Sequence, residues 1–229
     1  MRAFKLFGKL AAVAAFAFTS AFMSISAQAQ LTAGKDFTSI TPPQPTPPGK
    51  SVEVLEFFWY GCPHCNHLQT PLHEWLKRKP ADVAFRSQPA AFDDAWLQLA
   101  RTYYTIDALG ENDKLHGAVF EAIHKTNKLS PRTLGKDPKS LFEWVGTQKV
   151  DAKKFTDTYN SFSVVSKTQR TVDTTSAYGI TSTPTLAIDG RYLIAPSMTM
   201  RADNSVDYAR FFNNVDQLIA MARAARKGK

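Results

Sequence analysis

Cysteine is scarce in this sequence, because the 229 residues include only Cys62 and Cys65, with two residues between them. A chain of about this size can bury enough apolar surface to fold without disulfides. A bridge between these two residues would also close a very short loop, so it would constrain the unfolded chain little. Structural cross-linking therefore explains the pair poorly, and a chemical role is the better hypothesis.

Long apolar runs are also few. One apolar stretch, Leu10–Phe22, is shorter than the roughly 20 residues that a membrane-spanning helix needs, which argues against an anchor. Basic residues precede it, and a small-residue pattern that ends at Ala29 follows it. This arrangement predicts a cleavable export signal over residues 1–29, and the simplest location for the remaining chain is the bacterial periplasm.

Charge of one sign is not strongly in excess. The formal net charge is +8, and removal of the signal with Arg2, Lys5 and Lys9 leaves +5. The C-terminus is the exception, with basic residues at Arg223, Arg226, Lys227 and Lys229. Because cations at the end of a helix favourably oppose its dipole, we expect a solvated helix end here and no nucleic-acid partner.

Proline is concentrated in one segment. Residues 30–50 are polar, with a proline-rich core at Thr41–Pro48, and we interpret them as an extended N-terminal arm rather than as a PxxP ligand for another domain. Val52–Tyr60 follows as an apolar and aromatic run, which is typical of a buried strand. Glu56 is the one charged residue between Val54 and Tyr60, which makes it the exception in that run.

Helical spacing begins at Pro63, which suits a first helical turn, whereas Pro71 is expected to kink or split the helix. Alternation from Val83 to about Phe92 predicts a second strand. Five helical patterns follow, near Asp93 or Asp94 to Gly110, Leu115–Ile123, from Asp137-Pro138, from Asp151, and from Ser161 through Val172.

The strand pattern then returns. Thr185–Ile188 and Arg191–Ile194 are predicted strands joined by a hairpin turn at Asp189-Gly190. Apolar residues from Tyr208 to Ala222 mark a closing amphipathic helix. The order of elements is therefore β-α-β, a helical block, and α-β-β-α, which predicts an α/β fold with helices inserted into it.

Cys62 and Cys65 form a CxxC pair where the predicted strand gives way to a helix. Unpaired backbone N–H groups and the positive end of the helix dipole favour a thiolate at Cys62. The dipole supplies at most about 2 kcal/mol, or roughly one and a half pKa units, so we expect His64 to add a hydrogen bond or a charge. Because a stabilised thiolate stabilises the reduced pair, Pro63 and His64 favour a disulfide that is readily given away.

A metal site is the competing interpretation of the cysteines. Cys62, Cys65 and His67 could supply three ligands, but the sequence has no second CxxC or histidine pair to complete a structural zinc site. We therefore predict no metal. We expect His67 and the remaining histidines to be surface residues or hydrogen-bonded structural residues: His73, His116 and His124.

Three features together resemble one known family. They are Phe57–Cys65 at a strand-to-helix junction, the helical block, and Gly179–Thr185 before a strand and an Asp-Gly turn. This combination resembles the DsbA family of periplasmic thiol:disulfide interchange proteins over roughly residues 50–225. The resemblance implies a thioredoxin fold with an inserted all-helical domain. A low cysteine pKa and an oxidising couple are established properties of this family, so the resemblance implies them too.

The resemblance also divides the chain. The expected parts are a signal peptide at 1–29, an arm at 30–50, a first thioredoxin part at 51–92, a helical insertion at 93–161, and a second thioredoxin part at 162–229.

Further site residues follow from the resemblance. Thr183-Pro184 matches the cis-proline loop, where the Thr183 backbone could pair with an incoming peptide as an added strand, and an ordinary trans proline is the alternative. Glu56 matches the buried acid beneath the active site, which implies that it handles a proton for Cys65. The lysine that often accompanies this acid would fall near Ser87, and the adjacent Arg86 should point to the other face of the sheet.

The implied activity is donation of the Cys62–Cys65 disulfide to reduced, unfolded exported proteins. The implied reoxidant is a DsbB-like membrane quinone reductase, no cofactor beyond the disulfide is expected, and we expect a monomer. A reductase or isomerase with the same fold is the nearest alternative, although isomerases usually carry an extra dimerisation domain. A non-catalytic metal carrier is the alternative from a different class.

Overall fold

The structure is a computed structural model that describes residues 30–227, and the chain from Leu31 onward forms one unit. The predicted export signal and Lys229 lie outside the described residues. Within residues 30–227, no helix is both long and apolar enough to cross a membrane.

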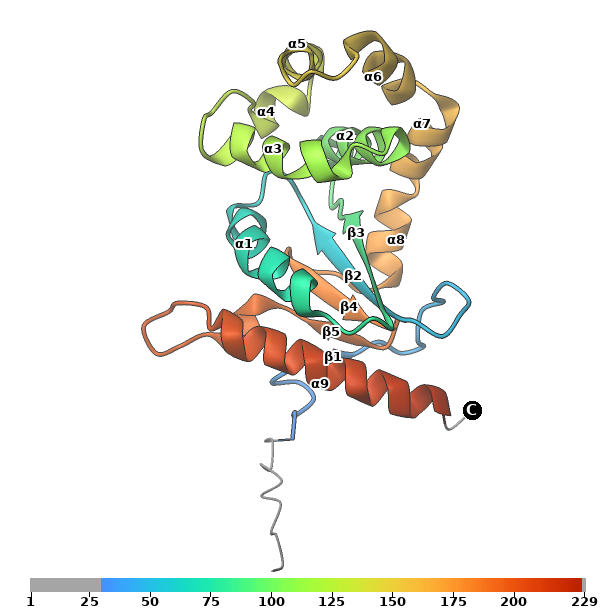
Figure 1. The fold of residues 1–229 in the computed structure, drawn as a ribbon, viewed down its shortest axis with the longest axis vertical. Coiled ribbons are helices and arrows are strands. Elements are labelled where there is room, and N and C mark those ends of the chain that lie inside the picture. The colour runs from blue at the N-terminus through green and yellow to red at the C-terminus, as the bar shows by residue number, and fades with distance from the viewer. Residues whose placement is uncertain (1–29, 228–229) are drawn as a thin grey trace, which may run out of the picture. The chain divides into compact units, whose positions relative to one another are not determined.

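One mixed sheet lies at the centre of the described chain (Figure 1). Its strand order is β1-β5-β4-β2-β3, and β2 and β3 are the one parallel pair of neighbouring strands in this sheet. The strands are β1 (Thr38–Ser39), β2 (Val52–Phe58), β3 (Val83–Pro89), β4 (Thr185–Ile188) and β5 (Tyr192–Ile194). The predicted hairpin is confirmed, because β4 and β5 pair directly across Asp189-Gly190.

Strand β2 is buried on both faces, which explains its nearly continuous apolar sequence. Val52 and Val54 point into an apolar cluster that includes residues of the first and last helices. Leu55 and Phe57 point to the opposite face, into a cluster with Tyr178 and Ile180.

Helix α1 (Pro63–Arg78) follows β2 and packs on the sheet through Leu68, Leu72 and Trp75. Pro71 was expected to kink or split this helix. It does not split the helix, which continues through Pro71 to Arg78. The buried side chains before and after Pro71 belong to one apolar cluster, which holds both parts of the helix against the same surface. This packing outweighs the single backbone hydrogen bond that proline removes.

The helical block lies between β3 and β4 and covers one end of the sheet (Figure 1). Its helices are α2 (Asp94–Leu109), α3 (Asn112–His124), α4 (Pro131–Leu134), α5 (Lys139–Thr147), α6 (Ala152–Tyr159), α7 (Phe162–Gln169) and α8 (Thr171–Ala177). Asp93 caps the start of α2 with its side chain, and Gly110 ends the helix in the left-handed conformation, at φ 69°. Asp151 and Ser161 cap α6 and α7 in the same way as Asp93.

The single helix predicted from Ser161 through Val172 is instead two helices. Arg170 lies between them, at the end of α7 and the start of α8. Threonine hydroxyls on both sides donate to the carbonyl oxygen four residues earlier, as Thr168 does to Val164 and Thr175 does to Thr171. Such bonds compete with the helical backbone pattern and bend helices, which explains the interruption.

The N-terminal arm joins the sheet, which its proline content did not predict. Thr38 and Ser39 form β1 and pair with β5, and the backbone N–H of Gln44 donates to the carbonyl oxygen of Gly190 at 2.8 Å. A Cβ at Gly190 would overlap the backbone of Gln44, so this approach requires glycine.

Helix α9 (Tyr208–Lys227) closes the fold against α1 and the sheet (Figure 1). Two of the basic residues near its end form ion pairs, Arg223 with Asp82 and Arg226 with Asp189. This part of the C-terminus therefore stabilises the fold itself.

Candidate functional site

Cys62 lies at the junction between β2 and α1. Its backbone N–H donates to the carbonyl oxygen of Trp59 at 3.0 Å, which closes a turn after the strand, and Pro63 occupies the first turn of α1. Proline suits this position because an N–H group there has no helical partner. The sulfur atom of Cys62 is therefore placed at the N-terminal end of the helix, and the residue is 8% exposed.

The environment of Cys62 favours its thiolate. Its pKa is lowered from 9.0 to about 5, chiefly because the Cys65 thiol donates a hydrogen bond to it. Burial opposes this effect, while Thr183 and the backbone N–H groups of Cys65 and His64 support it. The prediction of a stabilised thiolate thus agrees with the geometry, although the largest contribution comes from the second cysteine, which the sequence argument did not consider.

Cys65 has the opposite tendency. It is fully buried, and burial raises the pKa of its thiol well above 9.0. Its hydrogen bond to Cys62 and the negative charges of Cys62 and Glu56 raise it further. Both cysteines are free thiols in this structure. The two sulfurs are thus prepared for different roles, one as a stable thiolate and one as a stable thiol.

Glu56 is completely buried, and it is near enough to Cys65 for its charge to raise the pKa of that thiol. Its partner is Ser87, the residue opposite it on β3, whose hydroxyl donates to Glu56 Oε2 at 3.0 Å. The other carboxyl oxygen, Oε1, has no hydrogen-bond partner in the described chain. Burial raises the pKa of Glu56 to about 7, and the Ser87 bond only partly opposes this.

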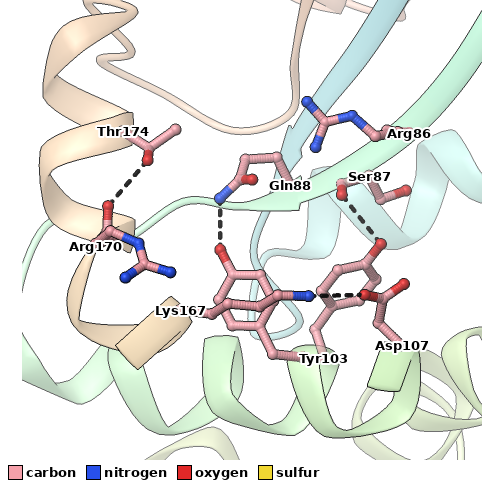
Figure 2. A pocket seen from close by; sticks show the side chains of 9 residues that line it. Arg86, Ser87, Gln88, Tyr103, Asp107, Lys167, Arg170 and Thr174 are labelled. Atoms are coloured by element: carbon pink, nitrogen blue, oxygen red, sulfur yellow. Dashed lines mark hydrogen bonds and ion pairs between the residues drawn. The ribbon is translucent and has the colours of Figure 1, made fainter. Parts of the chain in front are cut away.

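Arg86 does not take the place of the missing lysine beside Glu56. Its position in the strand predicted this, because its side chain should point to the other face of the sheet. Its guanidinium pairs with Glu53 at 2.9 Å. Ser87 instead lies at a cleft of about 240 Å³, where its carbonyl oxygen accepts a hydrogen bond from the Tyr103 hydroxyl at 3.0 Å (Figure 2). The partner of Glu56 could have been found from the pairing of the two strands, because the register of β2 and β3 places Ser87 opposite Glu56.

The loop before β4 faces Cys62. The Thr183–Pro184 peptide bond is cis, as the resemblance implied. In its thiol form Cys62 donates from Sγ to the carbonyl oxygen of Thr183 at 3.3 Å, although the two residues are 121 positions apart. The structure therefore brings Thr183 and Pro184 together with the cysteines.

An apolar groove begins beside these residues. It has a volume of about 640 Å³ and extends from Pro184 toward the first turn of α9. The imidazoles of His64 and His67 belong to its lining, together with Met200, Val206 and Tyr208. Its residues come from four separate segments, so no local sequence pattern could have indicated it.

Two of the remaining histidines bind Tyr60, and the third is exposed. His116 is half-buried and joined by a hydrogen bond to the Tyr60 hydroxyl at 2.9 Å, and the loss of solvent around its ring lowers its pKa to about 4. His124 donates from Nε2 to the carbonyl oxygen of Tyr60 at 2.8 Å. Both therefore hold Tyr60, and His73 is exposed on α1. Across residues 30–227, no three His, Cys, Asp or Glu side chains form a group that could hold a metal ion.

Comparisons with known proteins agree with this geometry. Residues 48–208 match the family model described as Thioredoxin. A thiol:disulfide interchange protein DsbA of Bordetella parapertussis is 39% identical, over 95% of this chain and 97% of the relative. Its counterpart in Pseudomonas aeruginosa is 33% identical, over 91% and 94%.

Solved structures give the same result. A crystal structure of Pseudomonas aeruginosa DsbA matches with a TM-score of 0.75 at 33% identity, covering 86% of this chain and 97% of the other. The oxidoreductase DsbA from Xylella fastidiosa matches with a TM-score of 0.75 at 29% identity, covering 85% and 98%.

The fold and the cysteine pair define a thioredoxin-like thiol:disulfide oxidoreductase with an inserted helical segment. Within this class, the chain belongs to the DsbA family, the thiol:disulfide interchange proteins that form disulfide bonds.

Proposed function

We propose that this protein is a periplasmic disulfide donor, which gives its Cys62–Cys65 disulfide to reduced exported proteins. The observation that carries this proposal is the opposite behaviour of the two sulfurs. The pKa of Cys62 is lowered to about 5 and that of Cys65 is raised, so the reduced pair is stabilised with one thiolate and one thiol. A couple whose reduced form is stabilised is a strong oxidant.

The reaction begins when a substrate thiolate attacks Sγ of Cys62, the less buried of the two sulfurs. The Cys62–Cys65 bond breaks, a mixed disulfide forms, and the electron pair leaves on Cys65. A second substrate thiolate then attacks the substrate sulfur of the mixed disulfide. Cys62 leaves as its stabilised thiolate, the substrate gains a disulfide, and the protein is reduced by two electrons.

Glu56 supplies the proton that Cys65 needs when it leaves. Because its pKa is about 7, the carboxyl is substantially protonated near neutral pH. It can give a proton to the Cys65 thiolate, whose own pKa is higher, and take one back during reoxidation. His64 lies between the sulfurs in sequence, and its backbone N–H supports the Cys62 thiolate. That the imidazole of His64 also stabilises the Cys62 thiolate with a positive charge stays a prediction.

The substrate backbone pairs with the cis-proline loop at Thr183, and its apolar side chains enter the groove beside Pro184. The redox-active disulfide is the only cofactor in this scheme. A DsbB-like membrane quinone reductase accepts the two electrons from the reduced protein, which acts as a monomer after export and removal of residues 1–29.

The first test is Cys62→Ser. The variant should no longer oxidise a reduced two-cysteine peptide, because the sulfur that receives the first attack is missing. Cys65→Ser is the matched control, since it retains Cys62 but cannot form the disulfide, so it should not oxidise the peptide either. Its Cys62 thiolate should still attack a one-cysteine peptide activated as a mixed disulfide with thionitrobenzoate, which releases thionitrobenzoate and leaves a protein–peptide disulfide that mass spectrometry detects under non-reducing conditions. Undiminished oxidation by Cys62→Ser would refute the assignment.

A second measurement separates a donor from a reductase or an isomerase. Equilibration of the protein with glutathione buffers gives the potential of the Cys62–Cys65 couple. We expect a value more oxidising than about −200 mV, whereas a more reducing value would favour the reductase.

A further inference from the structure

Three aromatic side chains form a second apolar surface beside Cys62, which we call the aromatic ledge: Trp59, Trp96 and Phe92. The rings of Trp59 and Trp96 are stacked, with centroids 4.1 Å apart and planes 18° apart. Phe92 packs edge-on against Trp96, with centroids 4.8 Å apart. Phe92 is 43% exposed, and both tryptophans are half-buried, so the ledge presents an aromatic surface to solvent.

The ledge and the groove lie toward opposite faces of the sheet. Trp96 packs against the cluster that contains Leu55 and Phe57. Tyr208, at the far end of the groove, packs against the cluster that contains Val54. Because neighbouring residues of β2 point to opposite faces, these two clusters are separated by the sheet. The ledge is therefore not an extension of the groove.

The turn before Cys62 is built around the Trp59 ring. A Cβ at Gly61 would overlap the indole, so the absence of a side chain at Gly61 makes room for it. The indole Nε1 is buried and donates to no acceptor in the part of the chain that the structure describes. Trp59 is thus held through the faces of its ring, by Trp96 and Gly61, rather than by its polar atom.

A substrate joined to Cys62 must come close to this surface. The Cα atoms of a disulfide lie about 4–7 Å apart, and each further residue of an extended peptide adds about 3.3 Å. Trp59 begins the turn that ends at Cys62, which places its Cα within about 7 Å of that of Cys62. The residues next to the substrate cysteine therefore lie within reach of the ledge during the mixed-disulfide stage.

We propose that the aromatic ledge binds a large apolar side chain of the substrate, located one or two residues from the cysteine that reacts with Cys62. The occupant is an extended segment of an unfolded polypeptide, whose apolar side chains are not yet buried. Trp59 packs against the cluster that contains Cys62, and the exposed aromatic rings of the ledge favour aromatic and aliphatic partners. This proposal deepens the proposed function by assigning a substrate preference to that site.

Two synthetic ten-residue peptides provide the test, each with two cysteines that can join in a disulfide, and oxidised glutathione restores the Cys62–Cys65 disulfide after each turnover. The first carries Trp between the cysteines, two residues from each, and the second carries Ser there. We expect Phe92→Ala to raise KM for the Trp peptide about 2- to 10-fold, the effect of losing one aromatic contact. KM for the Ser peptide and the rate with dithiothreitol should change less than twofold.

Phe162→Ala is the matched control. Phe162 is 86% exposed, the most of any large apolar side chain in the described chain, and it lies at the start of α7 rather than beside Cys62. This variant should leave both peptides unaffected. Trp96→Phe, which retains an aromatic ring, should preserve most of the preference. Equal effects of Phe92→Ala and Phe162→Ala, or an equal loss with dithiothreitol, would overturn the proposal.

A binding measurement separates the ledge from the proposed function. In a Cys62→Ser, Cys65→Ser protein, the Trp peptide should shift the indole N–H resonances of Trp59 and Trp96 in ¹H–¹⁵N spectra, and the Ser peptide should not. Shifts confined to residues of the groove would refute the ledge. If the unmodified protein oxidised neither peptide, the proposed function would be wrong. The spectra would still show whether the ledge binds the Trp peptide.

Discussion

Two acids on the same strand, Glu53 and Glu56, are both buried but have different partners. Glu53 is 4% exposed, and Arg86 reaches it with two nitrogen atoms, each at 2.9 Å. Glu56 is fully buried and has only the neutral hydroxyl of Ser87. Because they are three positions apart, their side chains point to opposite faces of the sheet.

The difference shows how one strand carries both a structural acid and a reactive acid. A cation beside a buried carboxylate compensates part of the cost of burying its charge, and Arg86 does so for Glu53. A buried carboxyl with only a neutral partner keeps its proton to a higher pH, which is what burial does at Glu56. The acid without a cation is the one on the side of Cys65, and its charge acts on that thiol.

The largest expected effect comes from Glu56→Gln, which resembles the protonated acid. The pKa of Glu56 is raised from 4.5 to about 7, so its contribution to stability is fully present below pH 4.5 and is lost as the pH rises through 7. The variant avoids this loss. The quantity to compare is the free energy of unfolding of the variant minus that of the unmodified protein. This difference should be about 3 kcal/mol larger at pH 8 than at pH 4.

Urea unfolding of the reduced proteins between pH 4 and pH 9 measures this difference. Cys62 also titrates in this range, but its lowered pKa makes stability rise with pH from about 5 to 9. Because both proteins contain Cys62, its contribution cancels in the comparison. A difference that stayed constant from pH 4 to pH 8 would show that Glu56 ionises normally.

Ser87→Lys should make Glu56 resemble Glu53. A cation opposite Glu56 should lower the pKa of the acid by about 1–3 units, and it should recover about 2 kcal/mol of stability at pH 8. Ser87→Met is the control, since it has similar length and no charge, and it should retain the pH dependence. If the lysine and methionine variants behaved alike, the missing cation would not explain the raised pKa of Glu56.

The sequence predicted the parts of this site that depend on neighbouring residues. The aromatic run of β2, the proline at the start of α1, the cap of α2 at Asp93 and the Asp189-Gly190 turn are all local effects, and each is present. Glu56 was recognisable because it interrupts an apolar run, and the resemblance gave it a role.

The parts that were missed depend on contacts between distant residues. Pairing of β1 with β5 joins Thr38 to Leu193, and proline content alone could not indicate it. The donation from Cys65 to Cys62 depends on the conformation of the helix turn rather than on residue type. The two tryptophans of the ledge come from different segments, and only their stacking in space identifies them as one surface.

The smallest expected effect comes from Arg86→Gln, on the Glu53 face. The Arg86 side chain is 51% exposed, so solvent screens its ion pair, and its loss should cost about 1 kcal/mol of stability. The variant should keep the fall in stability that Glu56 causes as the pH rises through 7, because Glu56 keeps its Ser87 partner. Urea unfolding at pH 6 and pH 8, with Ser87→Lys measured alongside, completes the comparison. If Arg86→Gln abolished this fall near pH 7, as Ser87→Lys should, the two faces of β2 would not be electrostatically separate.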